Sequence, residues 1–563
     1  MFKKSFMIGI LASIFIIGCN QNTNTPFTIE YEKYTLDNGL TVILHEDKSD
    51  PIVGVAIQYH VGSNRETPGR TGFAHLFEHM LFQESRHVGQ DQFFKKIQNV
   101  GGTLNGGTNK DGTVYFEVVP ENALETVLWM ESDRMGWLLP TVTQAVFENQ
   151  QEVVQNEKRQ RVDNRPYGHN DYVLIKNMYP EDHPYNWTTI GELEDLQNAT
   201  LQDVRDFYEK WYGPNNATMV IAGDIKKGEV KKLVEKYFGE INSGPDNGDP
   251  EPIPVQLDET RKVYHEDNFA SSPRLTMAFP TVDGKHADAS ALELMSQLLG
   301  DGKKAPLYKV IVEEKKLAPN FFSYSGTREI AGTFNIVVTG FPETNLTDVE
   351  SAVHEAFARF ESDGFTAADL ERLKAKYETG FYGGISSVLG KGFQLAYYNE
   401  YYGSPDALSV ELQKVLDVNM DDINRVYETY VKGRNYVLTS FVPKGKVELV
   451  AEGSVLFPVV EEEIVENVAK EAGTGGMNVE EITSTFDRSI EPVDGPQPRL
   501  NLPTIWRHKY SKGVALYGSK HDELPLINFG IQIDGGMLLD DPNKVGVANL
   551  ISGMMMEGTA NKT

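Results

Sequence analysis

The sequence is poor in cysteine, in positive charge and in long apolar runs. Cys19 is the only cysteine among 563 residues, so the chain has no pair from which to form an internal disulfide. Lysine and arginine number 53 against 81 aspartates and glutamates, which gives a net charge of -28. This balance argues against nucleic-acid binding, because phosphate contacts depend on basic side chains. After the N-terminal segment, no stretch is long and apolar enough to cross a bilayer.

The first 19 residues have the pattern of an export signal. Two lysines precede an apolar run at 7–17 that is too short to span a membrane. The run leads to Gly18 and Cys19, which resembles the lipobox of bacterial lipoproteins, where the cysteine is lipid-modified and becomes N-terminal. We therefore predict lipidation at Cys19 and a lipid-anchored protein of the bacterial cell envelope, on the periplasmic side. A plain secretory signal with an incidental cysteine is the alternative.

Two parts of the chain resemble each other and indicate a repeated domain. Residues 201–204 and residues 420–423 each open an amphipathic helix. Each helix leads, at the same distance, to an asparagine (Asn216 and Asn435) that enters an apolar strand. Strands and helices are mixed along both parts, which predicts α+β domains, each a sheet with helices packed on it.

A third part repeats the first at a constant offset and without gaps. Gly39 falls on Gly513 and Gly72 falls on Gly546. The chain ends at Thr563, inside this third copy, so we expect two complete domains, the start of a third, and a longer protein whose C-terminal half is missing. The predicted segments are a signal peptide at 1–19, a tether at 20–26, a first domain at 27–242, a linker at 243–258, a second domain at 259–455, a connector at 456–503 and the third domain from 504 to 563.

The chemistry is concentrated in an apolar, helix-forming run at 71–82. His75 and His79 are four residues apart, so both imidazoles project from one face of a helix, with Glu78 beside them. Burying these groups among phenylalanine, leucine and methionine is costly unless they are paired or bind a metal. Two satisfied histidines and an exposed glutamate are the alternative, but the H-x-x-E-H string is the inverzincin pattern and favours zinc.

Zinc bound by two histidines needs a third protein ligand. A second helical stretch, from about Phe147 to Arg161, offers Glu148, Glu152 and Glu157. Spacing alone does not choose among these three glutamates.

His75 to His79, followed after a long interval by Val153-Val154-Gln155-Asn156-Glu157, resembles the insulinase/pitrilysin family, which includes the mitochondrial processing peptidases. The resemblance implies tandem sheet-plus-helices domains and one Zn2+ per chain. It also implies that His75, His79 and Glu157 are the zinc ligands and that Glu78 is the general base. Members of the family often have a glutamate where this chain has Gln150, so the role of that position is open.

The glycine-rich stretch at 101–108 is similar to the family's substrate-binding edge strand. The resemblance implies that Asn105, Gly106 and Thr108 bind substrate. Glycines allow close backbone approach, and an exposed strand edge can bind an extended peptide through main-chain hydrogen bonds. An ordinary turn is the alternative for these glycines.

Under the constant offset, His75, Glu78 and His79 fall on Asn549, Ser552 and Gly553. We therefore expect only the first half of the protein to be catalytic. The sequence predicts a metalloendopeptidase that acts on peptides or unfolded polypeptide segments, with a non-catalytic peptide-binding scaffold as the alternative. We also expect the chain to bind zinc but to cleave weakly or not at all without its missing half, and to contact the membrane only through its lipid.

Overall fold

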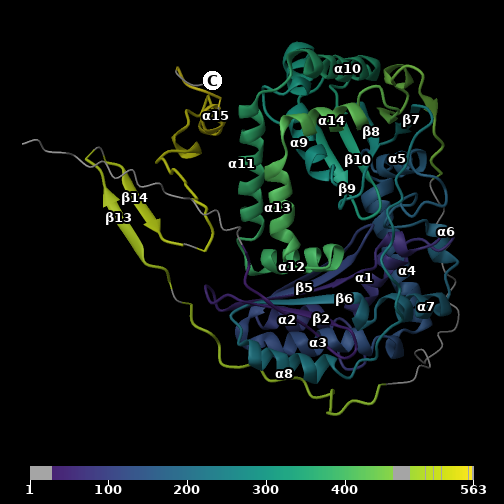
Figure 1. Cartoon of the computed structure of the whole chain (residues 1–563), viewed down its shortest axis with the longest axis vertical. Helices are drawn as coiled ribbons and strands as arrows, with labels where there is room; N and C mark the ends of the chain where they lie inside the picture. Colours follow the sequence, from purple (N-terminus) through teal and green to yellow (C-terminus); the bar gives the residue numbers. More distant parts are fainter. Residues whose placement is uncertain are drawn as a thin grey trace, which may run out of the picture. The chain divides into compact units, whose positions relative to one another are not determined.

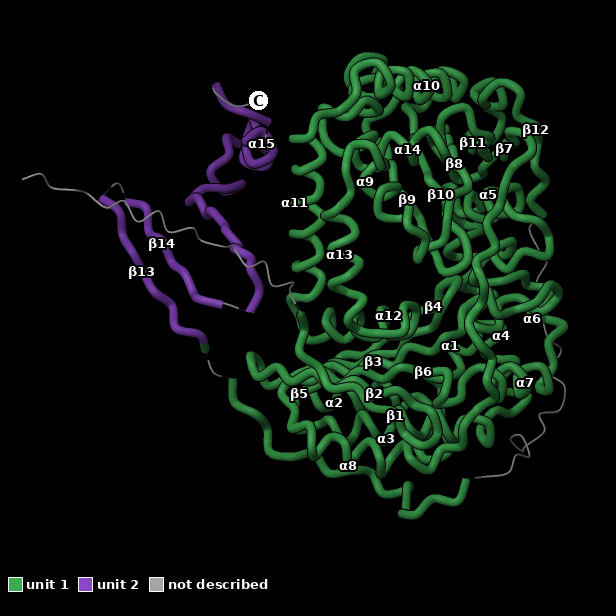
Figure 2. Tube along the Cα trace, in the orientation of Figure 1, with its two compact units in different colours: residues 1–502 green, residues 503–563 purple. Residues whose placement is uncertain are grey.

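A computed structural model describes residues 28–460, 482–500, 502–511, 513–521, 523–555 and 557–560. The chain divides into two compact units, one ending at Leu502 and the other starting at Pro503 (Figure 2). Cys19, the predicted lipidation site, and the rest of the N-terminal segment lie outside the described residues.

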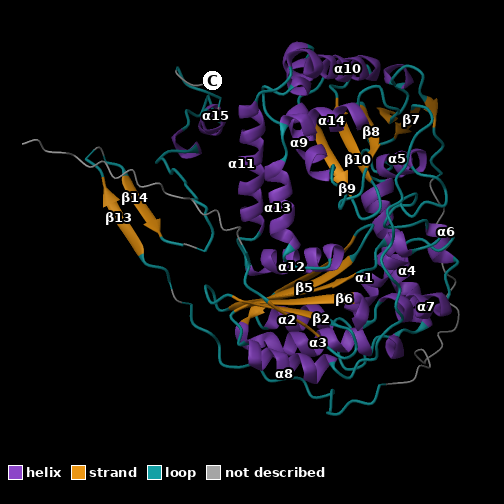
Figure 3. Cartoon of the chain, viewed as in Figure 1, coloured by secondary structure: helices purple, strands orange, loops and turns teal. Residues whose placement is uncertain are grey.

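The first unit contains two mixed sheets flanked by helices (Figures 1 and 3). The first sheet has six strands in the order β1-β2-β6-β3-β5-β4, and only β2 and β6 run parallel. Its strands are β1 (Glu32–Thr35), β2 (Thr41–Glu46), β3 (Ile52–Tyr59), β4 (Thr103–Thr108), β5 (Thr113–Pro120) and β6 (Ala217–Gly223). The helices of this part are α1 (Phe73–Gln83), α2 (Gln92–Asn99), α3 (Leu124–Gly136), α4 (Gln144–Lys158), α5 (Asn170–Met178), α6 (Leu193–Gln197), α7 (Leu201–Trp211) and α8 (Lys227–Phe238).

The second sheet also has six strands, in the order β12-β7-β11-β8-β10-β9. They are β7 (Arg261–Asp267), β8 (Arg274–Thr281), β9 (Phe321–Thr327), β10 (Gly332–Thr339), β11 (Val437–Pro443) and β12 (Val455–Leu456). The accompanying helices are α9 (Ala289–Gly300), α10 (Leu346–Asp363), α11 (Ala367–Gly384), α12 (Val388–Tyr402), α13 (Ala407–Asp417) and α14 (Met420–Tyr430). Five neighbouring strands therefore repeat the order and directions of β2-β6-β3-β5-β4. The predicted α+β fold of sheets with packed helices is confirmed.

The two helices singled out in the sequence, α7 and α14, both start where the pattern predicts. Each begins with a capping box, formed by Thr200 with Asp203 in α7 and by Asn419 with Asp422 in α14. In such a box the two side chains satisfy backbone N–H groups that would otherwise lack a partner at the helix start. Both helices therefore begin at a pair of polar residues that are three positions apart and precede an amphipathic run.

The two sheets exchange helices. α12, which follows the second sheet's early strands in sequence, packs on β3 and β6 of the first sheet, on the face opposite α3 and α8 (Figure 1). Conversely, α5 packs on β11 of the second sheet. Because helices cover both faces of the first sheet, every residue of β6 is buried. This exchange joins the two sheets into one unit.

Residues 482–500 pack as a strap against the helices of the first sheet. Arg488 is buried, with its guanidinium group 3.6 Å from the centre of the Trp137 ring and its Nε donating to Glu240 at 2.9 Å. Trp129 Nε1 donates to the Arg488 carbonyl oxygen at 2.9 Å. This described part of the predicted connector is thus anchored to the first domain.

The second unit reproduces local features of residues 32–83. It contains β13 (Ile505–Lys509), β14 (Ala515–Ser519), the short helix η8 (Met537–Leu539) and α15 (Val547–Met554). At the offset that separates Gly39 from Gly513, the starts of β14, η8 and α15 coincide with those of β2, η1 (Ser63–Arg65) and α1. β13 and β14 also pair in the register of β1 and β2. That this unit begins a third homologous domain stays a prediction.

Candidate metal centre

α1 carries the two histidines, and contacts at its first turn hold it in place. Its sequence contains no helix breaker after Gly72, which takes a left-handed conformation (φ 86°) that glycine adopts without strain. Glu66 satisfies the start of the helix: its carboxylate oxygens accept hydrogen bonds from the Gly72 and Ala74 N–H groups, both at 2.9 Å.

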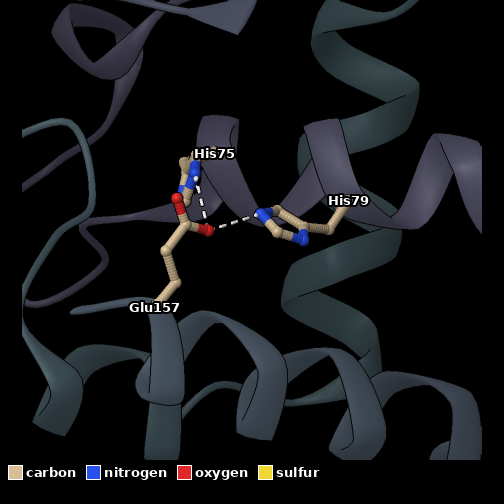
Figure 4. A group of neighbouring side chains, drawn as sticks. All are labelled: His75, His79 and Glu157. Atoms are coloured by element: carbon tan, nitrogen blue, oxygen red, sulfur yellow. Dashed lines mark ion pairs between the residues drawn. The ribbon is translucent and has the colours of Figure 1, made fainter. Parts of the chain in front are cut away.

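His75 and His79 project from the same face of α1 toward Glu157 of α4 (Figure 4). The His79 Nε2 atom lies 3.0 Å from Glu157 Oε2, and the His75 Nε2 atom lies 3.7 Å from the same oxygen. Their side chains are mostly buried, with 11% of His75, 22% of His79 and 16% of Glu157 exposed. Two helices distant in sequence therefore bring two imidazoles and one carboxylate together.

α4 and the turn that follows it orient Glu157. The helix starts at the N-cap Thr143, whose hydroxyl accepts from the Val146 N–H at 3.2 Å, and continues as a π-helical segment, η4 (Arg159–Asp163). Arg161, in this segment, places Nη1 2.8 Å from Glu157 Oε1. One carboxylate oxygen thus contacts Arg161 while the other is directed to the histidines.

The structure distinguishes among the three glutamates that the sequence offered. Among the residues that the structure describes, His75 and His79 form a group of potential metal donors with Glu157 alone. Glu148 instead accepts a hydrogen bond from Gln144 at 2.8 Å, and Glu152 is exposed. Gln150, the departure from the family pattern, is buried and donates to Asn149 at 3.0 Å.

The charges in this group suit a dication. Burial lowers the pKa of His75, and the charge of His79 acts in the same direction. The hydrogen bond from His79 lowers the pKa of Glu157, with help from the charges of His75 and Arg161. At neutral pH the group therefore keeps a carboxylate beside a neutral His75, and both can donate an electron pair to a metal.

The donor set fits zinc. Zinc binds imidazole nitrogen and carboxylate oxygen at about 2.0–2.2 Å, so two ligand atoms of a tetrahedral site lie about 3.4 Å apart. The Nε2 atoms of His75 and His79 lie 3.7 and 3.0 Å from Glu157 Oε2, and all three donors lie within 4.8 Å of one another. Three protein ligands would leave a fourth position open, as in catalytic zinc sites.

Two further sets of predicted residues lie near this group. Glu78 is on α1 between the histidines, and its charge raises the pKa of His75. Asn105, Gly106 and Thr108 are on β4, which forms an edge of the first sheet and packs against α1. A β-carbon on Gly106 would lie 2.9 Å from the ring of Phe82, so the strand approaches the end of α1 closely.

Sequence reasoning did not identify Glu66 or Asp195, which hold the start of α1. Glu66 lies six residues before Gly72, outside the three-residue spacing of a capping box. Asp195 comes from α6 and accepts from the Thr71 backbone N–H at 3.0 Å and from the Thr71 hydroxyl at 2.6 Å. Such a long-range contact leaves no local signal in the sequence.

Two family models match the chain. The model described as Insulinase (Peptidase family M16) matches residues 41–183, and the model described as Peptidase M16 inactive domain matches residues 198–377. All four residues of the candidate centre, His75, Glu78, His79 and Glu157, lie within the first match.

Several known proteins are similar to this chain. A Helicobacter pylori protein named zinc protease PqqE is 28% identical over 439 residues, which cover 77% of this chain and 97% of that protein. The crystal structure of a protease from Helicobacter pylori superposes with a TM-score of 0.68 at 27% identity, covering 74% of this chain and all of that one. The first half of the periplasmic protease PqqL from Escherichia coli shares the fold, with a TM-score of 0.59 at 18% identity and coverage of 73% and 92%.

Proposed function

Because the chain carries domains of the peptidase M16 (insulinase) family and has zinc protease homologues, we propose that it is a zinc-dependent endopeptidase with one Zn2+ per chain. In this proposal His75, His79 and Glu157 bind the metal and Glu78 is the general base. The substrate is a peptide or an unfolded segment of polypeptide. The observation that carries the proposal is the approach of two imidazoles of α1 to one carboxylate of α4.

The reaction requires a water to attack a peptide carbonyl while a proton moves to the leaving amine. Zinc supplies Lewis acidity, which polarises the carbonyl and makes water a stronger acid. Glu78 accepts the proton from the attacking water and passes it to the leaving nitrogen, as a general base and then a general acid. Its place on α1, between the two ligands, supports this role.

β4 would hold the substrate. As an edge strand of the first sheet, it leaves one side without a strand partner among the described residues. An extended peptide can add to such an edge through main-chain hydrogen bonds, which fixes the peptide direction with little demand on its sequence. Packing of β4 against α1 would bring that peptide beside the ligand-bearing helix.

The proposal also includes attachment to the bacterial envelope through a lipid on Cys19. Its support is the N-terminal sequence pattern and the periplasmic description of the Escherichia coli protease that shares the fold. No helix in the described part of the chain has the length and apolarity needed to cross a membrane.

Cleavage of a mixed pool of short peptides tests the function. The protein would be purified from residue 20 onward, supplied with zinc and compared with Glu78→Gln, which keeps the side-chain shape but removes the base. We expect the variant to bind zinc like the parent and to cleave at least about 100-fold more slowly, the lower end of what acid–base groups contribute. Glu152→Gln, a change at an exposed position of α4, is the matched control.

The results separate the two functions considered. Cleavage by the parent that is lost in Glu78→Gln and kept in Glu152→Gln supports the endopeptidase. A parent that binds zinc and peptides but cleaves none of them, both in this form and in a longer protein with the expected C-terminal half, supports the peptide-binding scaffold instead. Equal cleavage by parent and Glu78→Gln would contradict the role given to Glu78.

A further inference from the structure

Residues 190–197, called here the α6 bridge, contact both helices that carry the candidate zinc ligands. At one end, Asp195 Oδ2 accepts hydrogen bonds from the Thr71 hydroxyl at 2.6 Å and from the Thr71 N–H at 3.0 Å. The Thr71 hydroxyl in turn accepts from the Glu192 N–H at 3.0 Å. Thr71 is buried and directly precedes the N-cap residue of α1. The bridge therefore holds the start of the helix that carries His75 and His79.

Two glycines bring the bridge and α1 into direct backbone contact. Gly72 and Gly191 both have positive φ angles, 86° and 76°. A β-carbon on Gly191 would lie 2.4 Å from the Gly72 nitrogen, and one on Gly72 would lie 2.7 Å from the Ile190 carbonyl oxygen. Because the two backbones touch, the first turn of α1 cannot shift without moving the bridge.

The other side of the bridge contacts α4 on both sides of Glu157 in sequence. The buried Gln151 side chain donates to the Leu196 carbonyl oxygen. Lys158, the neighbour of Glu157, places Nζ 3.9 Å from Glu192 Oε2. Glu192 also pairs with Lys176 of α5 at 3.4 Å. One short segment thus connects the α1 start to the part of α4 that presents Glu157.

The second unit contains a helix, α15, that starts like α1 but lacks the threonine that contacts the bridge. There, Asp540 accepts from the Gly546 and Ala548 N–H groups at 2.8 and 3.0 Å, as Glu66 does at the start of α1. At the same offset, Thr71 is replaced by Val545, which has no hydroxyl group. A carboxylate therefore caps both α1, which carries the histidines, and α15, which does not. Of the two, only α1 is preceded by the threonine that contacts the bridge.

We propose that the α6 bridge, through Asp195 and Thr71, positions α1 against α4 and so presets His75, His79 and Glu157 for zinc. Asp195 and Thr71 are positioning residues that act through the two helices and do not contact the metal. This inference rests on the proposed function, because it assumes that the three side chains bind zinc. It adds a reason why the three side chains lie close together.

The test compares the zinc affinities of the parent and its variants. Each protein is prepared without metal and then competes for zinc with a chromophoric chelator. Thr71→Val, which copies the residue of the second unit, should weaken zinc binding by about 10-fold or more, the effect typical of losing an outer contact of a metal site. Thr71→Ser keeps a hydroxyl and should bind zinc as tightly as the parent. Asp195→Asn, which removes the charge but keeps the shape, should also weaken binding.

A matched control variant measures how much the loss of a buried threonine hydroxyl outside the bridge changes the stability of the fold and the zinc affinity. Thr126, on α3, is also buried and donates to Asp494 at 3.0 Å, and it is not part of the bridge. Thr126→Val should lower the urea midpoint of unfolding but leave zinc affinity unchanged. If Thr71→Val does not fold, Asp195→Asn and Thr71→Ser provide the same comparison.

The outcomes are distinguishable. Weak zinc binding by Thr71→Val or Asp195→Asn, with parent-like binding by Thr71→Ser and Thr126→Val, supports the proposal. A parent that binds zinc while Thr71→Val and Asp195→Asn bind it equally well overturns the positioning role alone. A parent that binds no zinc refutes the proposed function, and this inference with it.

Discussion

His79 Nε2 of α1 lies 3.0 Å from Glu157 Oε2 of α4, so a single carboxylate oxygen links the two helices of the candidate centre. Removing the charge of this carboxylate should disable the site. We predict that Glu157→Gln weakens zinc binding by at least about 10-fold, the scale that even outer-shell changes reach. Titration of the metal-free protein with zinc measures the effect.

Glu152→Gln is the control for this change, because Glu152 is on the same helix but exposed and outside the donor group. It should bind zinc like the parent. Equal loss of affinity in both variants would show that the effect comes from α4 in general and not from Glu157.

The close approach of β4 to α1 gives a second prediction. A β-carbon on Gly106 would lie 2.9 Å from the Phe82 ring, whereas one on Gly107 would meet open space. Gly106→Ala should therefore destabilise the fold by about 1–3 kcal/mol through overpacking and should lower peptide cleavage. Gly107→Ala should do neither. Urea unfolding and cleavage rates of the two variants check this, and matching behaviour would contradict the close packing of β4 on α1.

Glu66, the cap of α1, predicts a pH dependence of stability. Burial raises the pKa of Glu66 to about 8, against an ordinary value of 4.5. Between these values the folded chain holds a proton that the unfolded chain has released. Each unit rise in pH then lowers the free energy of unfolding by up to about 1.4 kcal/mol. The contribution of protonated Glu66 to the free energy of unfolding is thus fully present below pH 4.5 and is lost as the pH rises to 8.

Urea midpoints of the parent and of Glu66→Gln, measured from pH 5 to 8, isolate this contribution. The parent midpoint should fall relative to that of the variant as the pH rises. Measurement stops at pH 8 because burial lowers the pKa of Lys110 to about 8, and this group acts with the opposite sign above that pH. Parallel pH profiles for the two proteins would contradict the raised pKa of Glu66.

The N-terminal sequence predicts that Cys19 anchors the protein. Expressed in a bacterium with its signal, the parent should fractionate with membranes and incorporate labelled fatty acid, because a lipid chain adds buried apolar surface. Cys19→Ser should lose the label and be recovered in the soluble fraction. Membrane association of Cys19→Ser equal to that of the parent would contradict lipid anchoring.

Local patterns predicted much of the fold. The polar residues at the starts of α7 and α14 and the unbroken apolar run of α1 depend on neighbours within a few residues, so they can be recognised in the sequence. The sequence also predicted the face shared by His75 and His79. It could not choose Glu157 from three candidates without the family resemblance, because that choice depends on where two distant helices meet.

Other features depend wholly on tertiary packing and were not predictable. α5 and α12 each pack on the sheet of the other domain. The spacing of apolar residues along a helix shows which face is buried but not which sheet covers it. The burial of Arg488 beside Trp137 likewise depends on residues far apart in the chain. The contact of Asp195 with Thr71 belongs to the same class, although it lies next to the candidate centre.

The most direct test of the central claim is a crystal structure of the chain grown with zinc, with anomalous data collected at the zinc edge. One anomalous peak is predicted at about 2.0–2.2 Å from His75 Nε2, His79 Nε2 and a carboxylate oxygen of Glu157. No peak between these three side chains, or a peak held by other residues, would contradict the assignment of this centre.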